Sequence, residues 1–303
     1  MTTSEPRFRI QKLGEPKAAL GSGDTYLLED ALPVERAVFN ELLKEVKWHE
    51  MRHKGGRVPR EISIQGSITR RAEDGHDVEP VYRHPADEQP GLVHWTPSVL
   101  RIKNQVEELV GQELNHALIQ LYRDGRDFIG EHSDKTLDIL KGSSIYNYSL
   151  GASRTMVLKH KETGIRQRLH LPHNSLLLMG WRTNREWLHE IRMDKRPVSE
   201  KRPDELAFNG RRISLTFRTI ATFRDRRTGK LSGQGARVVG KVDDDVAAAA
   251  AAADERQKQQ TDLLVAFSAE NKTGAKFDWD EHYGRGFDVL NFNLVNTSGH
   301  QQH

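Results

Sequence analysis

Seven short segments rich in aliphatic, β-branched and aromatic residues follow one another between positions 115 and 223. Gly, Pro, Asn or Asp residues separate them, as is typical of short strands joined by turns. The segments are Asn115–Tyr122, Ser144–Leu150, Arg154–Lys159, Gln167–Leu171, Ser175–Met179, Trp187–Ile191 and Arg212–Ile220. Repeated short strands at this spacing indicate a sandwich or a jelly roll.

Two amphipathic patterns precede the strands and predict helices. Apolar residues at a spacing of four predict a helix that starts at Pro33, and a second apolar stripe predicts one that Ser98 caps and Gly111 ends. Residues 1–32 show little periodicity and are predicted to form an irregular arm. We therefore expect the helices to flank a mainly β domain that spans residues 33–223.

The composition changes after this domain. Residues 224–262 are predicted to be a polar linker with a helix at the seven alanines 247–253, because Ala has the highest helix propensity. Residues 263–303 contain too many apolar side chains for a disordered tail, so they are predicted to dock on the domain or on a partner. Residues 67–92 and 194–209 have the composition of loops. The predicted class is α+β, mainly β, with N-terminal helices and a C-terminal extension.

Composition excludes several classes of site. The chain has no Cys, which excludes disulfides, zinc–thiolate centres and thiol catalysis. No apolar run approaches the roughly 20 residues that span a bilayer, and the N-terminus lacks the apolar core of a secretory signal. We therefore expect an intracellular monomer of the nucleus or cytoplasm, with no membrane partner.

Positive charge is unevenly distributed, although the formal net charge is only +3. Residues 47–71 hold seven Lys or Arg against two acids, and residues 211–230 hold seven against one. The second stretch includes residues 224–230, which resemble a basic localisation signal. Basic surface favours polyanions such as nucleic acid, but charged runs are also common as solvated faces, and both interpretations stay open.

A His-x-Asp pair, His132 and Asp134, suggests a metal site. In an extended segment alternate side chains point the same way, so both could bind one cation. Iron(II) in the facial arrangement needs two imidazoles and one carboxylate, and His189 is the best-placed second imidazole. A chain with 14 His and 43 Asp or Glu residues also contains such pairs by chance, so a solvated turn remains the alternative.

The segment Arg212–Arg218 alternates strictly between polar and apolar residues. Ile213, Leu215 and Phe217 share one face, and the two arginines share the other with Ser and Thr. The polar face would meet water in an ordinary half-buried strand, or an anionic ligand inside a barrel. Two guanidinium groups suit a dicarboxylate, and beside iron this suggests 2-oxoglutarate.

These residues together resemble the AlkB-type iron(II)/2-oxoglutarate dioxygenases. The shared order is His-x-Asp, a distal His, and Arg-x5-Arg ending in Ser-Leu-Thr-Phe-Arg, within about Pro59 to Phe223. Further matching pieces are Leu121–Gly125, Gly130–His132, Ser149–Arg154 and Asn174–Met179. The resemblance implies a double-stranded β-helix that uses Fe(II), 2-oxoglutarate and O2, with oxidative demethylation of alkylated bases in DNA or RNA as its activity.

The resemblance also implies cosubstrate contacts. Arg212 matches the position that pairs with the distal carboxylate of 2-oxoglutarate, helped by Tyr122, and Arg218 matches the position nearer C1. Gln120 and Ser214 stand where the family carries Asn. Both departures keep polarity, so we expect cosubstrate binding to survive.

Substrate contacts are predicted at five further positions. Thr136 stands where nucleic-acid demethylases of the family carry an acid that contacts the methylated base, so the repair substrate is less strongly implied. Tyr82 and His84 are candidates to stack on a base taken out of its helix, or ordinary loop residues. Arg57 and Arg60 are candidates to contact phosphates. A nucleic acid with methylated bases is the expected partner.

Three functions are compatible with the sequence. The first is oxidative demethylation of nucleic-acid bases, the second is hydroxylation of a small molecule or a protein side chain, and the third is nucleic-acid binding without catalysis. The complete set of metal and arginine residues argues against the third. Turnover of 2-oxoglutarate with and without a methylated oligonucleotide separates them.

Overall fold

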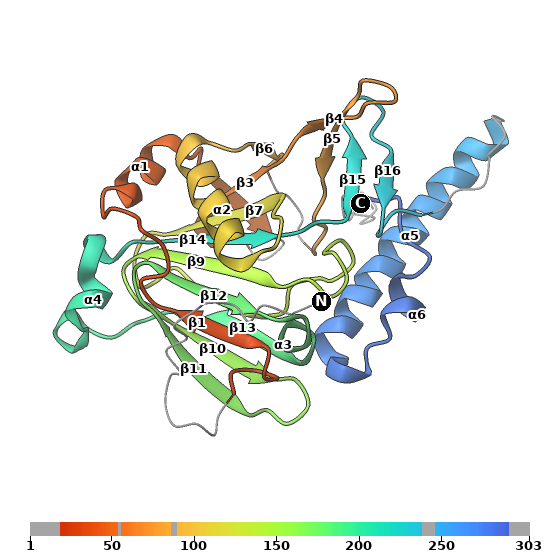
Figure 1. Ribbon diagram of the computed structural model, residues 1–303. Helices are drawn as coiled ribbons and strands as arrows, with labels where there is room; N and C mark the ends of the chain where they lie inside the picture. Colours follow the sequence, from red (N-terminus) through yellow and green to blue (C-terminus); the bar gives the residue numbers. More distant parts are fainter. Residues whose placement is uncertain (1–18, 54–55, 86–89, 238–245, 291–303) are drawn as a thin grey trace, which may run out of the picture.

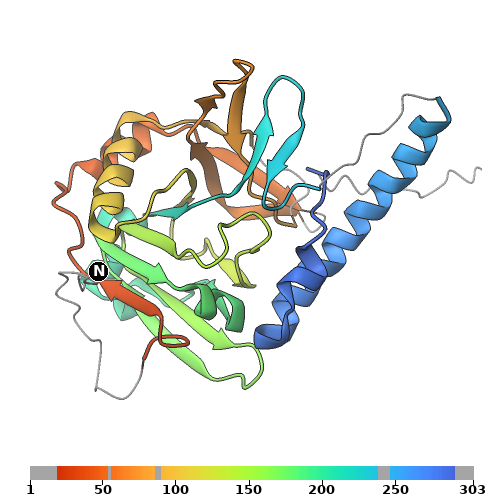
Figure 2. The ribbon, with the colours of Figure 1, turned by 45° about the vertical axis from the view of Figure 1, so that its right-hand side comes forward.

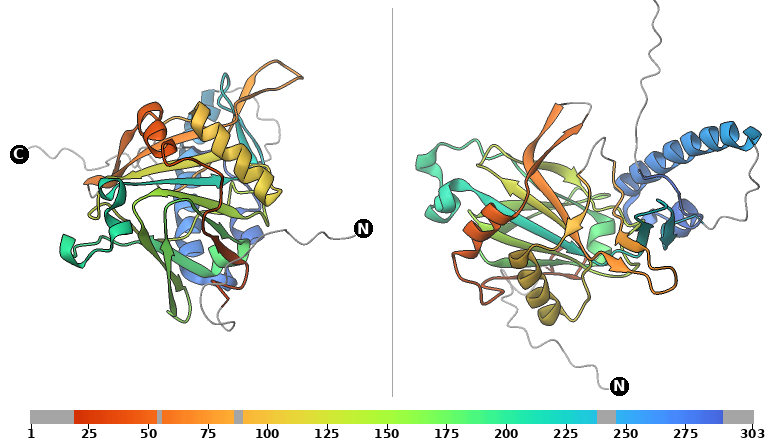
Figure 3. Two further views of the ribbon diagram at one scale, coloured as in Figure 1. Left: turned by 60° about the vertical axis from the view of Figure 1, so that its left-hand side comes forward. Right: turned by 90° about the horizontal axis from the view of Figure 1, so that it is seen from above.

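The computed structural model describes residues 19–53, 56–85, 90–237 and 246–290, without the side chains of 52–57 and 246–253. Most of the strands lie in two sheets that are almost entirely antiparallel and face each other (Figure 1). The helices lie outside these sheets, with α1 and α2 on one side and α5 on the opposite side (Figures 1 and 3).

The larger sheet has eight strands in the order β1-β12-β9-β14-β7-β3-β2, with β6 paired to β3. Only the β3–β6 pair is parallel among the described strands of this sheet. Its strands are β1 (Thr25–Leu28), β2 (His49–His53), β3 (Gly56–Gly66), β6 (Val93–His94), β7 (His116–Tyr122), β9 (Ile145–Gly151), β12 (Ser175–Met179) and β14 (Arg212–Arg218). The strand β14 therefore has a hydrogen-bonded neighbour on each edge, β7 and β9.

The smaller facing sheet has the order β11-β10-β13-β8. Its strands are β8 (Ile129–His132), β10 (Arg154–His160), β11 (Arg166–Leu171) and β13 (Trp187–Ile191). Apolar side chains of both sheets meet between them: Leu27, Tyr122, Met156, Leu158, Leu169, Leu171, Leu177, Trp187 and Ile191. The fold is the double-stranded β-helix, and all seven predicted strands are confirmed, with boundaries within two residues of the predicted ones.

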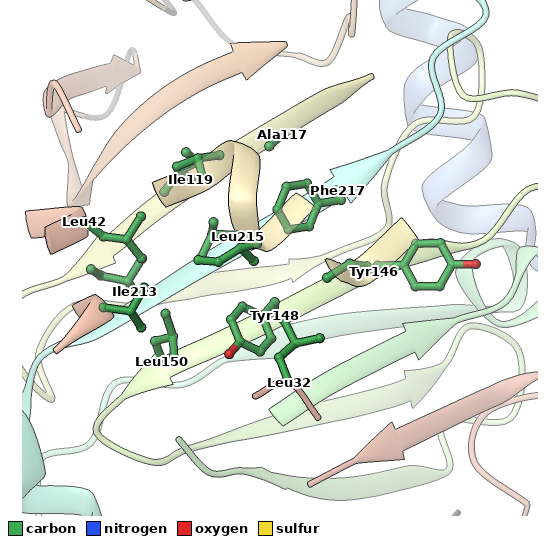
Figure 4. Packing of buried hydrophobic residues seen from close by; sticks show 14 of the residues in the cluster. Leu32, Leu42, Ala117, Ile119, Tyr146, Tyr148, Leu150, Ile213, Leu215 and Phe217 are labelled. Carbon is green, nitrogen blue, oxygen red and sulfur yellow. The ribbon is translucent and has the colours of Figure 1, made fainter. Parts of the chain in front are cut away.

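Helices α1 (Val38–Glu45) and α2 (Pro97–Val110) cover the outer face of the larger sheet. They pack on the apolar face of β14, where Ile213, Leu215 and Phe217 point outward from the barrel (Figure 4). Burial of this face stabilises the fold through the hydrophobic effect. The N-terminal helices therefore flank the sheet, as the sequence predicts.

The ends of these helices differ partly from the prediction. The chain becomes helical at Val38 rather than Pro33. Thr96 is the N-cap residue of α2, so Ser98 lies inside the helix and its hydroxyl bonds to the carboxylate of Glu45. Gly111 ends α2 with φ 67°, a left-handed conformation that glycine adopts without strain.

A third, smaller sheet corrects the prediction of loops and linkers. Its order is β16-β15-β5-β4, formed by β4 (Thr69–Arg70), β5 (Asp77–Pro80), β15 (Thr222–Asp225) and β16 (Leu231–Gly233). Parts of residues 67–92 and 224–262 are thus strands, and β1 lies within the predicted irregular arm, 1–32. Strands of two to four residues show too few alternations for a period to be recognised.

The predicted surface loop 194–209 contains short helices rather than irregular chain. They are η1 (Val198–Glu200), α4 (Pro203–Leu206) and η2 (Ala207–Gly210), and α3 (Trp181–Glu186) precedes β13. The strands β13 and β14 flank this insert, so it lies at one end of the barrel (Figure 1).

The C-terminal extension packs on the barrel through its own apolar cluster. It consists of α5 (Val246–Thr273), η3 (Gly274–Lys276) and α6 (Trp279–Tyr283), and Figure 2 shows α5 running beside the strands. The helix α5 includes the predicted poly-Ala helix but crosses the predicted boundary at 262/263. Among the described residues, α5 included, no helix combines the length and apolarity needed to cross a membrane.

Leu137 connects the extension to the barrel, because it packs in the same cluster as the extension's aromatic side chains. The other members are Leu263, Ala266, Phe267, Phe277, Trp279, Tyr283, Phe287 and Val289. Residues 263–290 therefore dock on the segment that follows β8.

A buried ion pair fixes the same segment. The guanidinium of Arg83 lies 2.6 Å from Asp138 Oδ1, and both side chains have no exposed surface. The remaining guanidinium protons are donated to the carbonyl oxygens of Phe287 (2.7 Å) and Gly235 (2.7 Å). Arg83 therefore connects the barrel, the third sheet and the C-terminal extension.

We expect Arg83→Met to lower the free energy of unfolding by about 3–5 kcal/mol, because it leaves the Asp138 carboxylate buried without a partner. Urea unfolding measures the change. The same substitution at Arg101, whose pair with Glu41 is about half exposed (52% and 47%), should cost less than about 1 kcal/mol. Equal effects of the two substitutions would show that the Arg83 pair does not hold the extension.

Candidate active site

The structure brings the three predicted metal ligands together. His132 ends β8 and pairs in register with His189 of β13, so their rings lie on the same face, with centroids 4.2 Å apart. Asp134 follows two residues after His132. One potential ligand atom from each of the three lies within 4.8 Å of the others. This donor set suits Fe(II) with open coordination positions.

Both histidines are held in the neutral form that binds metals. Burial lowers the pKa of His132 and lowers the pKa of His189 to about 3. The Nδ1 of His132 lies 2.8 Å from the carbonyl oxygen of Gly130, which can only accept, so Nδ1 carries the proton. The lone pair of His132 is therefore on Nε2, where it is available to an ion.

Asp134 is oriented by a buried arginine and an asparagine. Arg218 donates from Nε (2.9 Å) and Nη2 (2.7 Å) to Oδ2 of Asp134, so the guanidinium does not occupy Oδ1. Burial opposes ionisation, but the charge and hydrogen bonds of Arg218 hold the pKa of the Asp134 carboxyl well below its usual range. Asn184 of α3 exchanges two hydrogen bonds with the Asp134 backbone (3.0 and 2.9 Å). The carboxylate is thus ionised and fixed in position.

The polar face of β14 lines an inner cavity of about 40 Å³. Arg212, Ser214, Thr216 and Arg218 all contribute to it, together with the three candidate ligands and the predicted residues Gln120 and Tyr122. The alternation along β14 therefore separates an apolar face towards the helices from a polar face inside the barrel.

Arg212 is a buried cation with no anionic partner among the described residues. The residue is 1% exposed, and Nη2 donates to Ser149 Oγ (2.8 Å) and Asn147 Oδ1 (3.1 Å). Its Nε and Nη1 have no hydrogen-bond partner among the described residues. Burial lowers the pKa of Arg212 to about 10, which keeps it charged at pH 7. A buried, incompletely bonded guanidinium is costly, so this geometry fits an anionic ligand.

Two residues that contact Arg212 were missed by the sequence analysis: Asn147, which lines this cavity, and Ser149. Both lie on β9, where Tyr146, Tyr148 and Leu150 face the apolar core instead. Asn147 Nδ2 donates to Ser214 (2.8 Å) and Thr216 (2.9 Å). Asn147 of the neighbouring strand therefore places an amide beside Ser214, the position at which the resemblance implies an Asn, and the alternation of Ile145–Gly151 carried the signal.

An outer cavity of about 250 Å³ meets the inner one at His132, Asp134, Gln120 and Arg218. The side-chain nitrogen of Gln120, Nε2, has no hydrogen-bond partner among the described residues. It lies where the two cavities join and remains the candidate contact to the cosubstrate.

Three of the predicted substrate residues line the outer cavity: Tyr82, His84 and Arg60. The Tyr82 ring lies beneath Arg218, with the guanidinium carbon 4.3 Å from the ring centroid. Arg60 is only 8% exposed and donates to the carbonyl oxygen of Phe128 (3.0 Å), so it forms part of the wall rather than an exposed phosphate contact. The side chain of Arg57 lies outside the described residues.

The structure corrects the role expected for Thr136. This residue is fully buried and is absent from the described residues that line the outer cavity. Its hydroxyl donates to the carboxylate of Glu270 in α5, and its backbone N–H donates to the same carboxylate (3.0 Å). Thr136 therefore binds the C-terminal extension and does not face a substrate.

The basic stretch 211–230 does not form a single basic surface. Arg212 and Arg218 are buried inside the barrel. Arg224 and Arg226 both pair with the buried carboxylate of Glu79. The interpretation of this stretch as a nucleic-acid surface is therefore wrong for Arg212 and Arg218, whereas Arg224 and Arg226 stay partly exposed beside Glu79.

We expect Thr136→Asp to destabilise the protein by about 3 kcal/mol or more, because it places a second buried carboxylate against Glu270. Chemical unfolding measures the loss, and Thr163→Asp in an exposed turn should cost much less. Adding Glu270→Gln to Thr136→Asp should restore much of the stability, since an amide can donate to the new carboxylate. A stable Thr136→Asp single variant would contradict the assigned contact.

A family model described as "2OG-Fe(II) oxygenase superfamily" matches residues 24–218, a range that includes all three candidate ligands and both buried arginines. Mouse "DNA oxidative demethylase ALKBH2" is 35% identical over 134 residues, 42% of this chain and 52% of that protein. Bovine "Alpha-ketoglutarate-dependent dioxygenase alkB homolog 3" is 32% identical over 136 residues, 42% and 44% of the two chains. This chain thus spans about half the length of these curated relatives.

A solved structure described as "The structure of OsALKBH1" aligns with a TM-score of 0.43 and 16% identity, over 65% of this chain and 98% of that one. The sequence relatives confirm the resemblance to AlkB-type proteins. Because the family model covers well over half of the residues, the chain belongs to the 2OG-Fe(II) oxygenase superfamily.

Proposed function

We propose that the protein is an Fe(II)- and 2-oxoglutarate-dependent dioxygenase that removes methyl groups from ring nitrogens of nucleic-acid bases, acting as a monomer. The observation that carries the proposal is the Arg212 guanidinium, buried in the cavity of the His132, Asp134 and His189 cluster with two donors unpaired. A ligand that fits this cavity would have a carboxylate at one end, bound by Arg212, and a metal-binding group at the other end, beside the three candidate ligands.

His132, Asp134 and His189 would hold the metal. Fe(II), when bound, supplies the redox chemistry by which 2-oxoglutarate and O2 oxidise a C–H bond. The protein residues would position the reactants, since strands of the barrel and the segment after β8 provide the polar walls of the inner cavity.

Arg212 would bind the distal carboxylate of 2-oxoglutarate, with Tyr122 beside it. Its free Nε and Nη1 provide the charge-assisted hydrogen bonds that a carboxylate accepts. Gln120 and Arg218 line both cavities together with His132 and Asp134, and would face the 2-oxo acid end. This order matches the positions that resemblance to the family assigns to these residues.

The outer cavity would take the methylated base. An enzyme that acts on a base must either flip the base out of a duplex or bind it in a single strand. It then stacks the base against aromatic rings. Tyr82 and His84 provide rings in this cavity, with their centroids 5.6 Å apart. Oxidation of an N-methyl group gives N–CH2OH; its C–N bond breaks, the hydroxyl proton moves to nitrogen, and formaldehyde leaves. The name of the mouse relative, a DNA oxidative demethylase, supports this substrate class.

A second candidate is hydroxylation of a small molecule or a protein side chain. The outer cavity is lined by Arg60 and Lys135, and Thr136 provides no carboxylate there. Three cationic side chains, Arg60, Lys135 and Arg218, line this cavity against two acidic ones, Glu131 and Asp134, and this balance favours a neutral or anionic substrate over a positively charged base. This alternative keeps the same metal and cosubstrate.

One turnover experiment separates these functions. The enzyme is given Fe(II), 2-oxoglutarate and O2, with and without a single-stranded oligonucleotide that carries one N-methylated base. We expect succinate and formaldehyde in equal amounts only when the methylated base is present. Consumption of 2-oxoglutarate with no loss of methyl from any oligonucleotide would favour the hydroxylase, and no consumption under any condition would exclude both.

We expect Arg212→Met to raise the KM for 2-oxoglutarate by roughly thirtyfold or more, because a buried charge-assisted contact is lost. Arg212→Lys should recover only part, since an ammonium does not reproduce the guanidinium geometry. Arg211→Met is the matched control, as the neighbouring arginine donates to the Phe208 carbonyl oxygen outside the inner cavity. An unchanged KM in Arg212→Met would mean that this arginine does not bind the cosubstrate.

A further inference from the structure

One wall of the outer cavity is provided by a segment that the family match does not include. The helix α5 begins well beyond residue 218, where the match ends, yet its Asn271 lines this cavity together with His132 and Asp134. The side chain of Asn271 bonds to Ser133, which lies between these two candidate ligands in the chain. The C-terminal extension therefore forms part of the wall of the cavity that would take the methylated base.

The chemistry of its neighbours fixes the orientation of the Asn271 amide. Oδ1 accepts hydrogen bonds from Lys135 Nζ and from Ser133 Oγ (3.0 Å). An ammonium can only donate, so the atom that faces Lys135 must be the oxygen. Lys135 is itself buried and donates to the Phe267 carbonyl oxygen (3.0 Å), which holds it in place. The hydrogen bonds from Lys135 and Ser133 therefore fix the position of the Asn271 amide oxygen.

The nitrogen side of the same amide makes no hydrogen bond to the described residues. Because Asn271 lines the outer cavity, the two N–H donors of Nδ2 are available to a ligand there. A ligand in the outer cavity therefore meets a donor beside the metal ligands, from a side chain that cannot rotate to present its oxygen.

We propose that Asn271 is a specificity-determining residue that donates a hydrogen bond to a carbonyl oxygen next to the methylated nitrogen of the base. This inference rests on the proposed function. In 3-methylcytosine, N3 lies between the amino group and the O2 carbonyl. In 1-methyladenine, N1 lies between an amino group and a C–H. The pocket should therefore favour pyrimidines methylated at N3 over adenine methylated at N1.

The test compares two oligonucleotides of one sequence context, with 3-methylcytosine or 1-methyladenine at the same position. Both bases are cationic and both carry an amino group beside the methylated nitrogen, so the carbonyl is the difference that Asn271 would sense. We expect the wild type to favour 3-methylcytosine in kcat/KM, and Asn271→Ala to lower the ratio roughly fivefold to tenfold, as expected for one hydrogen bond. Dissociation constants measured without oxygen should shift in the same direction.

Asn271→Asp is the second variant, because its carboxylate keeps the contacts to Lys135 and Ser133 while the donor is replaced by an acceptor. The added charge acts on both cationic bases alike, whereas the new acceptor opposes the carbonyl oxygen of 3-methylcytosine alone. The kcat/KM ratio should therefore fall below that of Asn271→Ala. Ser268→Ala, an exposed position one turn earlier on α5, is the matched control and should keep the wild-type ratio.

The outcomes distinguish this inference from the function on which it rests. A wild type that demethylates either base, with a ratio unchanged in both Asn271 variants, would overturn the role of Asn271 alone. A wild type that consumes 2-oxoglutarate but demethylates neither base would overturn the proposed function and this inference with it. A ratio that falls in both variants supports both.

Discussion

Two arginines buried on one strand are the constraint on which the rest of the site depends. Transfer of a guanidinium from water into a protein interior costs several kcal/mol unless it is paired and hydrogen-bonded. Arg218 is paired with Asp134 within the protein, whereas Arg212 keeps two unpaired nitrogens. A ligand that supplies the missing anion would therefore bind the folded chain and stabilise it by mass action.

The C-terminal extension also contributes to the structure of the site. The segment after β8 carries Asp134. Its neighbours Ser133 and Thr136 bond to Asn271 and Glu270 of the extension, and Asp138 bonds to Arg83, which donates to the Phe287 carbonyl oxygen. Residues outside the family match thus hold the loop that bears a candidate metal ligand. The position of the carboxylate depends on packing that the shared domain alone does not provide.

Much of the fold and the centre of the site could be predicted because they depend on local periodicity. Alternation along Arg212–Arg218 separates core from cavity side chains, and the spacing of short strands indicates the jelly roll. The same rule applied to β9 would have found Asn147 and Ser149. Strands as short as β4 and β16 show too few alternations for the rule to work.

Other features depend on contacts between residues far apart in the sequence, which no local pattern carries. Thr136 matches a family position for substrate contact. In this structure it is buried and its hydroxyl donates to Glu270, which is distant in the chain. Asn271 reaches the cavity only because the cluster around Leu137 docks α5 on the barrel. A sequence motif identifies the ligands of a site, whereas tertiary packing decides what surrounds them.

The most direct test of the central claim is the selectivity of Arg212 for a second carboxylate. Anaerobic titration of the Fe(II)-loaded protein compares the dissociation constants of 2-oxoglutarate and pyruvate, which lacks the distal carboxylate. We expect the wild type to bind 2-oxoglutarate far more tightly than pyruvate, and Arg212→Met to bring the ratio of the two constants close to one. A wild type that binds the two acids equally, or a ratio that Arg212→Met leaves unchanged, would contradict the assignment of the buried guanidinium to the cosubstrate.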